Sequence, residues 1–264
     1  MKCKACVFDI DGTLVAKGAP GPSPRTLDAL KALSDAGTAL IVATGRAPFA
    51  ARHVLGAWQP DFLVCSTGAL VQDKAGKAVY AHTMSPEEMY ALVDYCEDHE
   101  VPMDFVFDDG YYAYVEYERL KAHALQGTRR FLLDGEDQVR HLQSMPYAAC
   151  IYALPGQMDG FAAKYGHLGL RLLPFATAGN FYDVLSPGTD KAASVALALA
   201  RLGLTWADAA AFGDGLNDEE MLAAAGLAVV MGNGEEQLKQ PGRIVAPACA
   251  EDGVARVIEQ YILQ

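Results

Sequence analysis

The sequence predicts an α/β protein in which a parallel-sheet core is interrupted by an inserted α+β domain. Short apolar runs alternate with helical patterns over the first 65 residues, and the same alternation returns after residue 188. Such alternation is typical of right-handed crossovers between parallel strands. Between these regions the alternation of strands and helices gives way to hairpin signals and isolated short elements, which indicates an inserted α+β segment. We therefore expect a Rossmann-like parallel-sheet core at residues 1–82 and 184–264, and an inserted α+β domain at residues 83–183.

The first part of the core is expected to contain three strands separated by two helices. The first helix has clear boundaries, because Ser23 is a good N-cap, Pro24 suits the first helical position and Gly37 follows the last turn. The expected strands are Ala5–Asp9, Leu40–Ala43 and Phe62–Cys65, and the expected helices are Ser23–Ala36 and Ala47–Leu55.

Two β-hairpins are expected after the regular alternation of strands and helices ends. The turn-forming segments Asp73–Gly76 and Asp108–Gly110 each separate two short apolar runs. The expected hairpin strands are Ala69–Val71 with Val79–Ala81, and Met103–Phe107 with Tyr111–Val115. Further helices are expected at Ser85–His99, Asp137–Gln143 and Gln157–Tyr165, and strands at Tyr147–Ala153 and Leu170–Leu173.

Regular alternation returns after the insert. The expected helices are Lys191–Leu202, Asp218–Ala225 and Val254–Leu263, and the expected strands are Ala209–Phe212, Leu227–Met231 and Ile244–Val245.

The composition indicates a folded, acidic protein. Hydrophobic residues make up 52% and charged residues 20% of the 264 residues, which excludes a disordered chain. The formal net charge of −12 argues against a nucleic-acid partner, since such binders normally present a basic face. No apolar run is long enough to cross a bilayer, and the amino terminus has no signal-peptide pattern. We expect a cytoplasmic protein with no membrane partner, as a monomer or a weak homo-oligomer.

The six cysteines do not form a metal-binding pattern. Cys3 and Cys6 are spaced as a C-x-x-C pair, but residues three apart on a strand face opposite sides of a sheet. No second pair completes a zinc site. We interpret the cysteines as reduced, mostly buried thiols.

The first strand ends in two aspartates, Asp9 and Asp11, followed by Gly12 and Thr13. Side chains just past the carboxyl end of a parallel strand face the binding crevice of an α/β sheet. There Asp9 can attack an electrophile and Asp11 can shuttle a proton, a common division of roles between paired carboxylates. Taken alone, the pair is equally compatible with ordinary turn chemistry.

Three further segments favour catalysis over a turn. A hydroxyl, a glycine and a cation, Thr44, Gly45 and Arg46, follow the second strand. Lys191 opens a helix, and Gly213-Asp214-Gly215-Leu216-Asn217-Asp218 follows a later strand. In this order the four motifs resemble those of the haloacid dehalogenase (HAD) superfamily of phosphohydrolases. The spacing resembles the Cof-type branch, which carries a large α/β cap between the second and third motifs.

The resemblance implies a Mg²⁺ cofactor and distinct carboxylate roles. Asp9 is expected to be the nucleophile, forming an aspartyl phosphate, and to bind the metal together with Asp214 and the backbone carbonyl of Asp11. The Asp11 side chain is expected to protonate the leaving group and then to activate water. Asp218 is expected in the outer shell of the metal. The alternative for the last motif is a polar or calcium-like turn.

The remaining motif residues are expected to bind phosphate or substrate: Thr44, Gly45, Arg46, Lys191 and Asn217. Lys191 in the first turn of a helix opposes the helix dipole, which favours a functional role in neutralising Asp9 and phosphate. Thr44 has an alternative role as a helix N-cap, and Arg46 has one as a surface charge.

One position departs from the family pattern. The family often shows Asn-Gly-Ala after the third strand, where this chain has Thr67-Gly68-Ala69. This difference removes the expectation of an asparagine contact to substrate. The insert is also rich in tyrosine, which we interpret mainly as β-strand packing.

We expect a Mg²⁺-dependent phosphomonoester hydrolase whose partner is a small phosphorylated metabolite, with sugar phosphates favoured by the resemblance. The alternatives are a phosphotransferase or sugar-phosphate mutase that uses the same aspartyl phosphate, and a non-catalytic phosphate-binding regulator.

Overall fold

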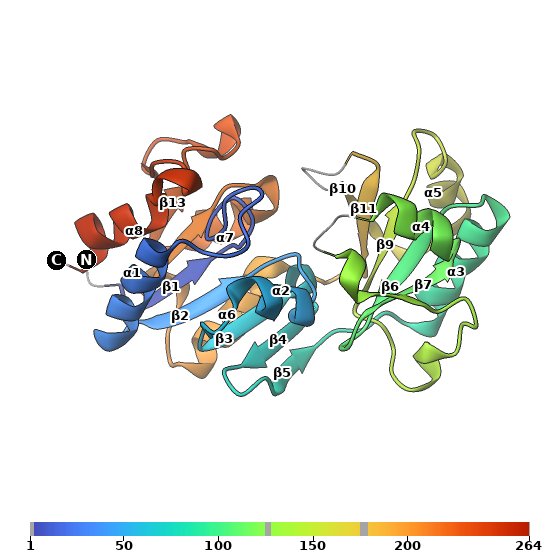
Figure 1. Ribbon diagram of the computed structural model, residues 1–264, viewed down its shortest axis with the longest axis horizontal. Coiled ribbons are helices and arrows are strands. Elements are labelled where there is room, and N and C mark those ends of the chain that lie inside the picture. Colours follow the sequence, from blue (N-terminus) through green and yellow to red (C-terminus); the bar gives the residue numbers. More distant parts are fainter. Residues whose placement is uncertain (1–2, 125–127, 175–178, 264) are drawn as a thin grey trace. The chain divides into compact units, whose positions relative to one another are not determined.

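The computed structural model describes residues 3–124, 128–174 and 179–263 (Figure 1). It separates into two compact units. The first comprises Met1–Tyr80 with Asp190–Gln264, and the second comprises Ala81–Thr189.

The first unit is built on an eight-stranded sheet with the order β14-β13-β12-β1-β2-β3-β4-β5. β1 lies between β2 and β12 and pairs in parallel with both. Parallel pairing continues to β3 on one side and through β13 to β14 on the other, whereas β3 and β4 are antiparallel. The strands are β1 (Ala5–Phe8), β2 (Ala39–Ala43), β3 (Phe62–Cys65), β4 (Leu70–Asp73), β5 (Ala78–Ala81), β12 (Ala209–Gly213), β13 (Leu227–Val230) and β14 (Ile244–Val245).

The α-helices of this unit within the described residues are α1 (Pro24–Asp35), α2 (Pro48–Leu55), α6 (Lys191–Arg201), α7 (Glu219–Ala224) and α8 (Gly253–Val257). Apolar residues of α6 and α7 pack with Ala5, Val7 and Ile41 in one buried cluster on one face of the sheet. α1 begins as expected, because the Ser23 side chain accepts a hydrogen bond from the Thr26 amide and Pro24 occupies the first helical position. Both features fix the entry to the helix.

The second unit contains a six-stranded sheet with the order β10-β11-β9-β6-β7-β8. One face packs against α3 and α5 around Phe105, Tyr114 and Ile151. The other face carries a smaller apolar cluster that includes Leu120 of α4. The elements are β6 (Met103–Val106), β7 (Tyr111–Val115), β8 (Leu132–Asp134), β9 (Ala148–Tyr152), β10 (Arg171–Pro174), β11 (Phe181–Leu185), α3 (Pro86–Asp98), α4 (Tyr117–His123) and α5 (Asp159–Tyr165).

The structure corrects the sequence prediction inside this second unit. The helix expected at Asp137–Gln143 is wrong, since only the single 3₁₀ turn Arg140–Leu142 forms there. Gln138 has a φ of +53°, which no α-helix accommodates, and Arg140 binds Asp108, Asp109 and Ser144 instead.

Among the described residues of the second unit, the sequence analysis predicts neither the α-helix α4 nor the strands β8 and β11. β8 has only three residues, and two of them are exposed, so its apolar signal is weak. Asp183 interrupts the apolar run of β11. Near the carboxyl terminus, the helix expected at Val254–Leu263 is α-helical only over α8 and continues as a π-helical turn, Ile258–Ile262.

Candidate active site

Residues that follow three neighbouring parallel strands make up the site. Asp9 follows β1, Thr44 follows β2, and Asp214 follows β12. β1 lies between the other two strands, and the strand order reverses beside it, because β2 continues one half of the sheet and β12 opens the other. Ligands of open α/β sheets bind at such a reversal, outside the carboxyl ends of the strands.

Lys191 bridges two buried carboxylates at this edge of the sheet. Its Nζ donates hydrogen bonds to Asp9 Oδ1 at 2.7 Å and to Asp218 Oδ1 at 2.5 Å. All three side chains are at most 8% exposed. Lys191 is the first residue of α6, whose N-cap Asp190 accepts a hydrogen bond from the Ala193 amide. The cation is therefore held next to the expected nucleophile by a capped helix and a second carboxylate.

Asp218 also orders the loop that carries Asp214. Its Oδ2 accepts hydrogen bonds from the amides of Asp214 at 3.0 Å and Gly215 at 3.1 Å. A Cβ on Gly213 would lie 2.6 Å from the Asp218 Cβ, so a glycine is needed where this loop leaves β12. Both oxygens of Asp218 are thus engaged by groups of the protein.

The loop after β1 packs against Asp214. Thr13 Oγ1 donates a hydrogen bond to Asp214 Oδ1 at 2.9 Å. Gly12 has a φ of +83°, and a Cβ there would lie 2.1 Å from Asp214 Oδ2. Gly12 is therefore required both by the turn and by the close approach of this carboxylate.

Three carboxylates form a possible metal site. Oxygens of Asp9, Asp214 and Asp218 lie within 4.8 Å of one another. An all-oxygen set of carboxylates suits a hard divalent cation such as Mg²⁺. The donors present therefore fit the cofactor expected from the sequence.

The electrostatics of the cluster favour an additional cation. Burial raises the pKa of Asp9 well above its ordinary value, and Lys191 only partly opposes this. Burial and the neighbouring Asp218 raise the pKa of Asp214 to about 7. Burial alone would lower the pKa of Lys191, but Asp218 and Asp9 reverse this and raise it. The carboxylates thus carry more negative charge than Lys191 balances, and a bound cation would relieve it.

Asp11 is held by Arg46. Arg46 Nε donates to Asp11 Oδ2 and Arg46 Nη2 donates to Asp11 Oδ1, both at 2.6 Å. The Asp11 side chain is 56% exposed, unlike the buried Asp9. The two carboxylates of the first motif therefore have different surroundings: one lies next to a buried lysine, and the other lies at the surface beside an arginine.

Thr44 is buried, and its Oγ1 accepts a hydrogen bond from the Arg46 amide at 3.2 Å. It does not cap the following helix, because the N-cap of α2 is Ala47. Gly45 lies between these two residues and is partly exposed, and Asn217 is exposed in the 3₁₀ turn Leu216–Asp218.

Comparison with known proteins identifies the family. A sequence profile of the haloacid dehalogenase-like hydrolases matches residues 6–258. The chain belongs to the haloacid dehalogenase-like hydrolase family. An HMP-PP phosphatase from Klebsiella pneumoniae is 30% identical over 268 residues, which cover 98% of this chain and 96% of that protein.

Solved structures show the same HAD fold. A protein from Geobacillus kaustophilus superposes with a TM-score of 0.83 at 26% identity, covering 99% of this chain and all of that one. A sugar phosphatase of HAD subclass IIB superposes with a TM-score of 0.79 at 23% identity, covering 99% of this chain and 100% of that one. These comparisons confirm the predicted family, the α/β fold class and the enzyme class, a phosphatase of the HAD type.

Two polar residues of the site, Thr13 and Asn233, are not predicted to belong to it by the sequence motifs. Thr13 belongs to the first motif but has no predicted role of its own, although it contacts Asp214. Asn233 Nδ2 donates to the Gly12 carbonyl at 2.9 Å and lies 3.5 Å from Asp214 Oδ2, while its Oδ1 accepts from the Cys249 amide. Glycines flank Asn233 in the sequence, a pattern typical of a turn, but a single sequence does not show which loop such a turn meets.

The departure from the family pattern lies in a strained turn. Ser66 and Thr67 have φ values of +47° and +54°. This left-handed region suits asparagine better than a β-branched residue such as threonine. The turn is tied to the second motif, because the Ser66 amide donates to the Arg46 carbonyl and the Thr67 amide donates to the Thr44 carbonyl.

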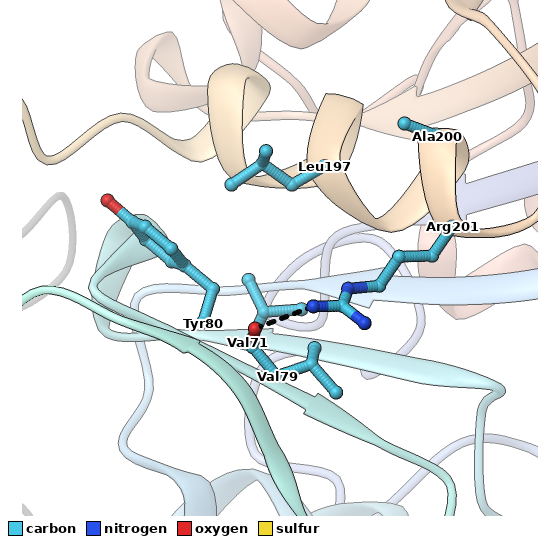
Figure 2. Close-up of a pocket in the computed structure, with 6 residues that line it drawn as sticks. All are labelled: Val71, Val79, Tyr80, Leu197, Ala200 and Arg201. Atoms are coloured by element: carbon cyan, nitrogen blue, oxygen red, sulfur yellow. Dashed lines mark hydrogen bonds between the residues drawn. The ribbon is translucent and has the colours of Figure 1, made fainter.

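A cavity of about 360 Å³ in the first unit lies apart from these residues (Figure 2). It is bounded by the β4–β5 hairpin and α6, and Arg201 closes one side by donating to the Val79 carbonyl at 3.0 Å. None of the motif carboxylates lines it. In the part of the chain that the structure describes, no helix is both long and apolar enough to span a membrane.

Proposed function

We propose that this HAD phosphatase is a Mg²⁺-dependent phosphomonoester hydrolase that acts on small phosphorylated metabolites through an aspartyl phosphate on Asp9. The observation that carries the proposal is the Lys191 bridge between Asp9 and Asp218, because it places one cation against a carboxylate at the strand reversal. Attack of a carboxylate on an anionic phosphate is opposed by charge repulsion. A buried lysine beside the carboxylate offsets part of this negative charge and so favours the attack.

In the first step, Asp9 attacks phosphorus while the bond from phosphorus to the leaving oxygen breaks. Lys191 offsets the charge of Asp9 and of the incoming phosphate. Thr44 and Gly45 supply a hydroxyl and a backbone N–H to the transferring phosphoryl oxygens, and Asn217 lies at the exposed rim for contact with the substrate. Asp11 gives its proton to the leaving oxygen.

In the second step, Asp11 takes a proton from water, which attacks the acyl phosphate and releases inorganic phosphate and free Asp9. Arg46 holds the Asp11 carboxylate by two hydrogen bonds, so it orients the proton shuttle between the two steps. We assign Arg46 this role in addition to the substrate contact expected from the sequence.

Asp9, Asp214 and the Asp11 backbone carbonyl would hold Mg²⁺, with Asp218 in the outer shell. Asp218 fits that position because its oxygens already bind Lys191 and two amides. When bound, Mg²⁺ supplies positive charge that offsets the charge on the transferring phosphoryl group.

The second unit is proposed to act as the cap that selects the leaving group, with residues 83–183 as the inserted segment. Sugar phosphates are the favoured substrate class, because the sequence motifs resemble those of HAD phosphohydrolases and a protein of the same fold is a sugar phosphatase. The protein is proposed to act in the cytoplasm, in keeping with the six free cysteines of the described residues.

A chromogenic phosphomonoester such as p-nitrophenyl phosphate tests the proposal. We expect release of inorganic phosphate without any acceptor, dependent on added Mg²⁺. Phosphate transfer only in the presence of a sugar acceptor would favour the phosphotransferase alternative. Binding of phosphate without turnover would favour a non-catalytic regulator.

A further inference from the structure

Asn233, on the loop after β13, contacts three other segments of the first unit. Its Nδ2 donates to the Gly12 carbonyl, on the loop after β1, at 2.9 Å. The same Nδ2 lies 3.5 Å from Asp214 Oδ2, on the loop after β12. Its Oδ1 accepts a hydrogen bond of 2.7 Å from the Cys249 amide. A side-chain amide offers both a donor and an acceptor, so one residue serves all three contacts.

The backbone around Asn233 is held close to Asp214. A Cβ on Gly234 would lie 2.9 Å from the Asp214 carbonyl oxygen, so a glycine is needed for this close approach of the two loops. The Glu235 amide also donates to the Asp214 carbonyl at 3.0 Å. These backbone contacts on the carboxyl side of Asn233 therefore fix its position relative to Asp214.

The side-chain contacts form a closed ring that includes the Asp214 carboxylate. Thr13 Oγ1 donates to Asp214 Oδ1 at 2.9 Å, and the Thr13 carbonyl accepts a hydrogen bond from Cys249 Sγ at 3.0 Å. Cys249 in turn donates its amide to Asn233, whose Nδ2 faces Asp214 Oδ2. Asp214 is therefore held at both carboxylate oxygens, with Asn233 at Oδ2.

This arrangement suits an action of Asn233 through Asp214 and not by contact with the substrate. Nδ2 carries two hydrogens and faces two acceptors, so its donors are already engaged. Oδ1 is an acceptor and would repel an anionic phosphate. Asp214, by contrast, is a carboxylate that fits a Mg²⁺ ligand. Groups that hydrogen-bond to a metal ligand fix its orientation, and their loss typically costs about 10–100-fold in metal affinity or activity.

We propose that Asn233 is a positioning residue that orients the Asp214 carboxylate and the loop after β1 for Mg²⁺, and so sets the affinity of the site for the metal. The inference rests on the proposed function, because it depends on Mg²⁺ binding at Asp214. It adds the loop after β13 to the metal site, although none of the four motifs includes that loop.

The Mg²⁺ affinity of the metal-free protein tests the proposal. The rise of the melting temperature with Mg²⁺ concentration gives a dissociation constant without any turnover. We expect this constant to increase by about 10-fold or more in Asn233→Ala. At saturating Mg²⁺, the KM of the variant for p-nitrophenyl phosphate should stay close to that of the wild type, because Asn233 does not contact the substrate.

Gln240→Ala is the matched control. Gln240 is also an exposed amide side chain in the segment after β13, and its Nε2 donates to the Gln237 carbonyl at 3.3 Å, within that segment. This variant should keep the wild-type dissociation constant for Mg²⁺. A purely structural role of Asn233 would lower the melting temperature of the metal-free protein and leave the dissociation constant for Mg²⁺ unchanged.

A wild-type dissociation constant for Mg²⁺ in Asn233→Ala overturns the inference. If that variant does not fold, Asn233→Ser tests the same point, because its hydroxyl can donate to only one of the two acceptors. An unchanged constant in the serine variant is then equally decisive. An increased KM with an unchanged Mg²⁺ affinity would make Asn233 a substrate contact, which also overturns the inference.

The failure of this inference can be told apart from the failure of the proposed function. If the wild type binds Mg²⁺ but releases no phosphate from p-nitrophenyl phosphate, the proposed hydrolase fails, and the dissociation constants still decide the role of Asn233. If the wild type needs Mg²⁺ for hydrolysis and Asn233→Ala binds the metal equally well, only the role of Asn233 fails. If Mg²⁺ does not raise the melting temperature of the wild type, the metal dependence and the role of Asn233 fail together.

Discussion

Arg46 holds the carboxylate of Asp11 through two parallel hydrogen bonds of 2.6 Å, from Nε and Nη2. Arginine and a carboxylate match in shape in this way, and such pairs fix orientation as well as charge. Asp11 is otherwise exposed and lies on the loop after β1, so this contact decides where its oxygens point.

Replacing Arg46 with alanine should therefore impair the proton shuttle more than substrate binding. We expect kcat to fall by about 10-fold or more, also for a substrate whose leaving group needs no proton, because the second step still needs the Asp11 carboxylate as its base. The pH profile of kcat should also shift relative to the wild type. Arg52→Ala is the control, because Arg52 lies on the adjacent helix α2 and binds Gln72 instead of a motif residue. A raised KM with an unchanged kcat would contradict a role through Asp11.

Asp218 should contribute strongly to stability. Asp218→Ala leaves Lys191 with one partner in place of two and removes the acceptor of the Asp214 and Gly215 amides. Breaking a buried ion pair typically costs about 3–5 kcal/mol. Urea unfolding of both proteins would measure this loss.

Glu219→Gln provides the comparison in the next residue. Glu219 pairs with Arg243, but its own side chain is 37% exposed, so water can solvate the groups left by the substitution and the cost should be smaller than at the buried bridge. A cost for Asp218→Ala no larger than that for Glu219→Gln would show that the bridge is not the structural centre of the site.

Mg²⁺ should stabilise the folded protein even without substrate. A ligand that binds only the folded state raises the melting temperature in a saturable way. Asp214→Asn should abolish the rise, because it removes an anionic metal ligand. Asp208→Asn should preserve it, since Asp208 lies just before β12, at the opposite end of that strand, and pairs with Lys4. An undiminished rise in Asp214→Asn would place the metal elsewhere.

Asp183 should make the stability of the protein depend on pH. Burial raises its pKa to about 7 in the folded state, whereas an unfolded aspartate titrates near 3.9. The folded state therefore holds this proton more tightly, and the carboxyl destabilises folding progressively as the pH rises from about 4 to about 7.

Asp183→Asn removes that penalty. The variant should match the wild type near pH 4 and gain about 2–4 kcal/mol over it by pH 7, after which the difference levels off. Unfolding free energies at several pH values would measure the difference. A difference that stays constant between pH 4 and pH 8 would show that Asp183 titrates normally in the folded protein.

The sequence predicted the core better than the insert, for a physical reason. Core strands such as Ala5–Phe8 and Ala209–Gly213 are buried on both faces and are apolar throughout, so their signal is strong. In the insert, Asp183 breaks the apolar run of β11, and side-chain contacts of Arg140 replace a helix that local propensity favours. Tertiary contacts of this kind are not visible in a local pattern.

The same distinction applies to the site. Asp9, Asp214 and Lys191 lie in recognisable motifs, and parallel strand ends bring them together. Asn233 was not predicted from the sequence, because its contact with the Gly12 carbonyl joins residues 221 positions apart. The pairing of Arg46 with Asp11 likewise depends on the β1–β2 neighbourhood and not on either motif alone.

The separate roles of Asp9 and Asp11 form the central claim, and detection of the covalent intermediate tests them most directly. Both Asp9→Asn and Asp11→Asn should lose steady-state turnover, by about 10²–10⁴-fold for the acid–base residue. With an activated substrate whose leaving group needs no protonation, Asp11→Asn should still accept the phosphoryl group and release it slowly. Rapid quenching followed by mass spectrometry should then find added phosphoryl mass on the Asp9 peptide of Asp11→Asn and none in Asp9→Asn. Substantial turnover by Asp9→Asn, or phosphoryl mass on a different residue, would contradict the account.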